Sequence, residues 1–99
     1  MPIETEPFDP ADHLKSPEAQ AELLADAFET GDPAYITNAL GIVARARGVA
    51  SVAKEAGVTK KALYKALSSE GNPRLSTLMG VMKAFGVKLS VDPGNQKTA

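Results

Sequence analysis

Residues 49–68 constrain the fold most strongly, because small or aliphatic side chains stand wherever two short helices joined by a tight turn must touch. Ala53 falls where the two helices cross and only a small side chain fits, and Gly57 falls where the turn needs a positive φ. The other agreeing positions are Val52, Ala56, Val58, Leu63 and Ala66. This spacing predicts a helix-turn-helix motif with helices over roughly 50–56 and 59–68.

The second helix of this motif has an outward face of polar, basic and small residues. We expect Lys60 and Lys61 to donate hydrogen bonds to guanine O6 and N7 or to phosphates, because the N-terminal part of such a helix meets base edges in the major groove. Tyr64 and Lys65, one turn further on, are placed to reach a phosphate or a base edge. Thr59 is expected to cap the helix and to donate to a phosphate.

Charge is divided unevenly along the chain. Residues 1–32 hold nine acidic side chains and one lysine, whereas residues 33–99 hold ten basic and three acidic side chains. Lys54 belongs to the first motif helix, which crosses the DNA backbone, and Arg45 and Arg47 extend the basic field. The alternative is a helical hairpin whose lysines serve only solubility. The acidic part either offers a face to a basic partner or solvates its own helix.

Two more helices are marked by their starts. A Ser-Pro pair at 16–17 and an Asp-Pro pair at 32–33 each combine a capping side chain with proline at the first helical position. These helices are predicted to end at Gly31 and Gly48.

A fifth helix is expected over 75–85, after a loop marked by glycine, asparagine and proline at 71–73. Its apolar residues recur at helical spacing, which predicts that Met79, Met82 and Phe85 lie in the core.

The segment Val87–Val91 alternates apolar and polar residues, which is the period of a β-strand. One strand cannot satisfy its own backbone groups, so we expect it to pair with the same strand of a second copy across a two-fold axis. The expected dimerisation residues are Val87, Leu89 and Val91. The expected organisation is an extended arm over 1–15, a helix-turn-helix domain over 16–91 and a disordered tail over 92–99.

Composition leaves little for catalysis or metal binding. The chain has no cysteine and a single histidine, His13, which we expect to be a surface or arm residue. No nucleophile has a base beside it, so we expect no catalytic residue, no metal site and no cofactor. No apolar run approaches the about 20 residues that span a bilayer, and the acidic N-terminus lacks the features of a signal peptide. A cytoplasmic location without membrane contact is therefore expected.

Five segments carry a resemblance to known proteins: FDPADHL at 8–14, VARARG at 43–48, GVTKKALYKAL at 57–67, EGNP at 70–73 and FGVKL at 85–89. With them the chain resembles the phage-repressor and Cro-like helix-turn-helix superfamily, preceded by an extra helix at 16–30. More narrowly, it resembles the probable addiction-module antidote family, a HigA-like group of antitoxins.

The resemblance implies an all-α, five-helix domain that forms a homodimer and binds operator DNA near its own gene. It also implies the antitoxin of a type II toxin–antitoxin module, which represses its own operon and neutralises a RelE/ParE-like toxin. Such toxins are usually basic, which would suit the acidic residues 1–32. The alternatives are a stand-alone phage-type repressor and a protein-binding adaptor.

The chain departs from the family pattern at two positions. Ala50 stands where many relatives carry a serine or threonine cap, so the start of the first motif helix is expected to be weak. Arg74 stands where many repressor domains have threonine, and it is expected to add a phosphate contact.

Overall fold

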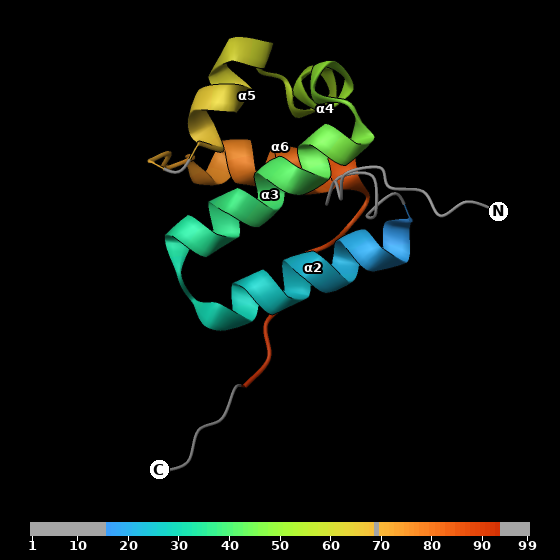
Figure 1. The fold of residues 1–99 in the computed structure, drawn as a ribbon, viewed down its shortest axis with the longest axis vertical. Helices are drawn as coiled ribbons and strands as arrows, with labels where there is room; N and C mark the ends of the chain where they lie inside the picture. The colour runs from blue at the N-terminus through green and yellow to red at the C-terminus, as the bar shows by residue number, and fades with distance from the viewer. Residues whose placement is uncertain (1–15, 69, 94–99) are drawn as a thin grey trace, which may run out of the picture.

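Residues 16–68 and 70–93 are described by the structure, a computed structural model, and they are all-α (Figure 1). The helices in these ranges are α2 (Pro17–Thr30), α3 (Pro33–Arg47), α4 (Val49–Ala56), α5 (Lys60–Ala66) and α6 (Leu75–Phe85). The five predicted helices are thus confirmed, with ends shifted by at most two residues. The predicted arm over 1–15, with His13, and residues 94–99 of the predicted tail lie outside the described residues.

Helix α3 runs through the middle of the molecule, with α2 along one side and α4 and α5 on the other (Figure 1). Helices α2 and α3 pack against each other as a hairpin, and α6 packs against α4 and α3. Because α3 and α6 lie between them, α2 and α5 occupy opposite sides of the fold.

The starts of α2 and α3 follow from their caps. The Ser16 hydroxyl accepts a hydrogen bond from the Ala19 amide at 3.1 Å, and the Asp32 carboxylate accepts one from the Ala34 amide at 3.1 Å. A proline follows each cap at the first helical position, where its missing N–H costs nothing. Both predicted starts are therefore confirmed, and α2 ends at Gly31 as predicted.

The core is built from aliphatic side chains of all five helices, with Phe85 as its only fully buried aromatic among the described residues. Its members include Leu24, Ala27, Leu40, Val43, Val52, Leu63, Val81 and Met82. Met79 was predicted to join Met82 and Phe85 there, but it is 48% exposed, so this prediction is wrong. Helix α6 buries the face centred on Val81 and Phe85. At about 100° per residue, Met79 lies about 160° around the helix from Val81 and about 120° from Phe85, which places it on the exposed side.

Residues 87–91 do not form a strand. The Val87 amide donates to the Met82 carbonyl at 3.1 Å, and the chain then runs without regular structure past α2. A strand needs a neighbour to bond with its backbone groups, and the described residues of one chain offer none. The predicted strand is therefore wrong for the single chain, whereas its pairing with a second copy stays a prediction.

One polar cluster ties three helices together at the end of α3. Arg47 Nη1 donates to Gln20 Oε1 at 2.7 Å, and the guanidinium carbon lies 5.9 Å from the centre of the Phe85 ring. Arg47 is thus held at the junction of α2, α3 and α6, where it serves packing as well as charge.

Two glycines inside helices make a matched test of how closely α6 approaches α4. A Cβ at Gly80 would lie 2.9 Å from the Ala56 carbonyl oxygen, whereas one at Gly41 would meet nothing nearer than 3.5 Å. We expect Gly80→Ala to lower the free energy of unfolding by about 1–3 kcal/mol through overpacking. Gly41→Ala is expected to raise it by up to about 1 kcal/mol, because alanine favours the helix.

Chemical denaturation followed by circular dichroism measures both changes. Equal effects of the two substitutions would mean that α6 can move away from α4 without cost.

Candidate nucleic-acid interface

The turn between α4 and α5 has the geometry that its sequence predicts. Gly57 has φ 79°, its amide donates to the Lys54 carbonyl at 3.2 Å, and the Val58 amide donates to the Ala53 carbonyl at 3.0 Å. This is the Schellman pairing that ends a helix at a left-handed glycine. Val58 then packs against the core, which fixes the direction in which the chain enters α5.

The starts of the two helices differ. The Thr59 hydroxyl accepts a hydrogen bond from the Ala62 amide at 3.0 Å, which confirms the predicted cap of α5. Helix α4 is preceded by Gly48, and no side chain caps it. Ala50 lies inside the helix, so the prediction that position 50 is its cap is wrong, whereas the uncapped start is observed at Gly48.

The residues predicted to hold the two helices together point inward. Val52, Ala53 and Leu63 are buried, and Ala56, Val58 and Ala66 are half-buried. Leu63 is 1% exposed and is the only buried residue of α5. The position of α5 on the domain therefore depends strongly on this one side chain.

The predicted DNA-contacting residues of α5 all face solvent. Lys60, Lys61 and Lys65 are exposed, and Tyr64 is 55% exposed although it is large and aromatic. Lys54, in the last turn of α4, is exposed as well. The structure thus brings the predicted basic side chains onto one continuous α4–α5 unit.

Basic groups also flank α5 on both sides. A small hollow on one side is lined by Arg45 of α3 together with Leu63 and Tyr64. On the other side, Lys65 shares the lining of a larger hollow with Arg74. The exposed face of α5 therefore lies between Arg45 on one side and Arg74 on the other, with the acidic Glu70 also lining the larger hollow.

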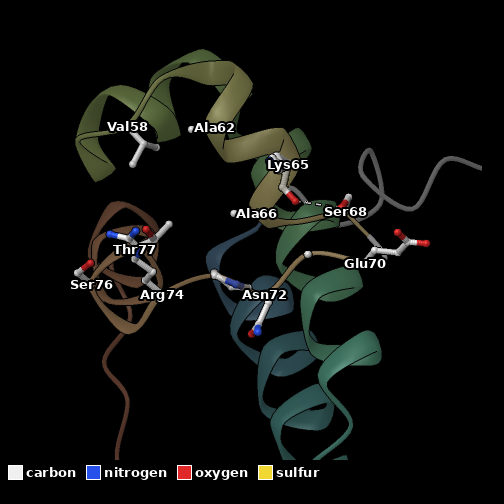
Figure 2. Close-up of a pocket in the computed structure, with 12 residues that line it drawn as sticks. Val58, Ala62, Lys65, Ala66, Ser68, Glu70, Asn72, Arg74, Ser76 and Thr77 are labelled. Atoms are coloured by element: carbon white, nitrogen blue, oxygen red, sulfur yellow. Dashed lines mark hydrogen bonds between the residues drawn. The ribbon is translucent and has the colours of Figure 1, made fainter.

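The larger hollow, of about 900 Å³, opens between α5, residues 68–74 and the start of α6 (Figure 2). Arg74 stands at the N-cap of α6, where no side chain caps the helix, and Ser76 and Thr77 lie in its first turn. The first amide groups of such a helix lack partners within the helix and favour an anion. Sequence reasoning singled out Arg74, whereas Ser76 and Thr77, which line the same hollow, were not among the predicted site residues.

Gly71 sets the shape of this hollow. A Cβ at this position would collide with the backbone of Ala66 and the carbonyl oxygen of Lys65. The loop therefore passes directly against the end of α5, and a glycine is required by close approach.

The remaining predicted site residues lie elsewhere. Val87, Leu89 and Val91 follow α6 on the side of α2, away from the exposed face of α5. Within the part of the chain that the structure describes, no group of three or more acidic or histidine side chains could hold a metal ion. No helix in that part is long and apolar enough to cross a bilayer.

Comparison with known proteins identifies the class. The model of the family described as "Probable addiction module antidote protein" matches residues 4–93. An uncharacterized protein of Haemophilus influenzae is 42% identical over 84 residues, which cover 85% of this chain and 87% of that protein. No solved structure gives a significant match. The chain therefore belongs to the probable addiction module antidote family, as its sequence motifs predict.

Proposed function

We propose that this antidote-family protein is an antitoxin that binds operator DNA as a dimer, represses its own operon and neutralises a RelE/ParE-like toxin. The observation that carries the DNA-binding part is the exposed, basic outer face of α5 on a helix–turn–helix unit. A helix with one buried anchor and an outward row of lysines suits insertion into a major groove. The role is one of binding, with no catalytic step.

The positions of the basic side chains divide their roles. Lys60 and Lys61, at the start of α5, are proposed to meet base edges, because the N-terminal part of a recognition helix enters the groove first. Lys54 is proposed to contact phosphate from α4. Lys65 and Arg74 line the hollow of Figure 2 from opposite walls and are proposed to hold the DNA backbone there. Thr59, at the cap of α5, is proposed to donate to a phosphate, and Tyr64, one turn further on, is proposed to reach a phosphate or a base edge.

Dimerisation is proposed to use residues 87–91. Leu89 and Val91 are exposed although they are apolar, and no regular structure occupies the backbone of this segment. Pairing with a second copy would satisfy those backbone groups. Sedimentation as a monomer at tens of micromolar (roughly the range where weak dimers form) would count against this arrangement.

The DNA-binding part is tested by fluorescence anisotropy. The full-length protein is titrated against the duplex upstream of its own gene and against a scrambled duplex, at several salt concentrations. Tight binding to the first duplex alone, with a steep salt dependence, is expected. Equal binding to both duplexes, tested also with the protein from the adjacent gene present, would contradict the proposed repression.

A further inference from the structure

Helix α2 carries a row of acidic side chains on its outer face. Glu18, Glu22, Asp26 and Glu29 are spaced by four, four and three residues, which places them on one side of the helix, and all are exposed. Helix α2 itself contains no lysine or arginine. Among the described residues, none of these carboxylates forms an ion pair.

This row weakens the helix that carries it. Like charges four residues apart repel each other, as in the Glu18–Glu22 and Glu22–Asp26 pairs. Glu29 lies in the last turn, where the helix dipole disfavours a negative charge. Only Glu18, in the first turn, is favoured by the helix dipole. The rest of the row costs the fold stability, and a cationic partner would relieve the repulsion.

An apolar groove runs beside the acidic row. Ala21 and Ala25 are exposed next to it, and together with Phe28 they line a hollow of about 220 Å³. Its other side is formed by Val87 and Leu89, with Lys88 between them. A strip of apolar surface bordered by four acids fits a segment with apolar side chains on one face and basic side chains on the other.

We propose that this surface, formed by the outer face of α2 and residues 87–90, binds a basic amphipathic segment of a partner protein. The four carboxylates outweigh the single positive charge of Lys88, so nucleic acid is repelled, and the α2 face of a second copy is repelled for the same reason. Identification of that partner as the toxin rests on the proposed function. The groove uses the side chains of Val87 and Leu89, whereas the proposed dimer pairing uses the backbone of residues 87–91 and the exposed Val91.

The location of this surface has a functional consequence. Helix α2 lies on the side of the fold opposite to α5 (Figure 1). The partner segment and DNA therefore do not compete for the same face, and the protein can hold both at once.

The test uses the full chain and a defined probe. A synthetic 14-residue peptide with lysine on one helical face and leucine on the other is titrated into the isotopically labelled protein and followed by NMR. We expect shifts of amide signals in α2 and residues 87–90, and none from the same peptide with glutamate in place of lysine. Shifts confined to other surfaces would overturn the proposal.

Charge reversal separates binding from folding. In Glu22→Lys plus Glu29→Lys the repulsive pairs along α2 become attractive, so we expect the melting temperature to rise by about 5 °C. Peptide affinity is expected to fall about 10- to 100-fold. The matched control is Glu55→Lys plus Glu70→Lys, which changes net charge equally but lies on α4 and the 68–74 loop. Equal affinity of the reversal variant and the control for the peptide would refute the proposal that the peptide binds this surface.

Two further measurements complete the test. Ala25→Gln keeps the charge and the helix but blocks the apolar strip, and we expect peptide affinity to fall several-fold without a change in melting temperature. The protein from the adjacent gene is then bound to wild type, reversal variant and control. If it binds all three equally, the toxin docks elsewhere and the assignment of this surface to it is wrong. If it binds none, the toxin part of the proposed function fails, while the peptide result still decides the surface.

Discussion

Replacement of Leu63 by alanine is expected to lower the free energy of unfolding by about 2–5 kcal/mol. Leu63 is 1% exposed and is the only side chain of α5 that is buried in the core. Its truncation leaves a cavity between α5 and the rest of the domain, and it removes the anchor that orients the outward lysines. We therefore expect DNA affinity to fall together with stability, even at temperatures where most molecules remain folded.

The same substitution at Leu75 is the matched control. Leu75 is 71% exposed at the start of α6, so Leu75→Ala should change stability by no more than about 0.5 kcal/mol. Urea denaturation followed by circular dichroism compares the two variants. A loss below about 1 kcal/mol for Leu63→Ala would show that α5 is held by contacts other than its buried leucine.

The elements that sequence could predict are those fixed by local chemistry. The caps at Ser16, Asp32 and Thr59 each bind a backbone amide two or three residues ahead, and the positive φ of Gly57 follows from the turn that it must make. Such features need no knowledge of distant residues. For this reason the helix positions and the outward face of α5 follow from the amino-acid sequence alone.

The errors and omissions depend on contacts between distant segments. Helical spacing places Met79 near the apolar face of α6, but only the packing of α6 on α4 shows which side is covered. Residues 87–91 have the alternation of a strand, yet a strand needs a neighbour that the described residues, 16–68 and 70–93, do not supply. The approach of the 68–74 loop to α5, which requires Gly71, likewise joins segments whose contact the sequence does not reveal.

The double substitution Lys61→Ala plus Lys65→Ala is expected to weaken operator binding about 100-fold at moderate salt. Both side chains are exposed on α5, one on its outer face and the other at the hollow of Figure 2, and neither is part of the core. Stability should therefore stay nearly constant while affinity falls. The slope of log affinity against log salt should shrink by roughly 1 for each lost phosphate contact.

Lys83→Glu changes net charge by the same two units at an exposed position on α6, outside both the α4–α5 unit and residues 87–91, so it controls for net charge. Its effect on affinity should be several-fold at most, because it acts only through the long-range field. Lys54→Ala should weaken binding to all duplexes alike, whereas Lys60→Ala or Lys61→Ala should relax the preference at one base pair. Equal losses in Lys83→Glu and in the double lysine variant of α5 would mean that net charge, and not the face of α5, governs binding. A changed sequence preference in Lys54→Ala would show that α4 contacts bases. This result would contradict the proposed docking, in which α5 enters the major groove and α4 contacts the DNA backbone.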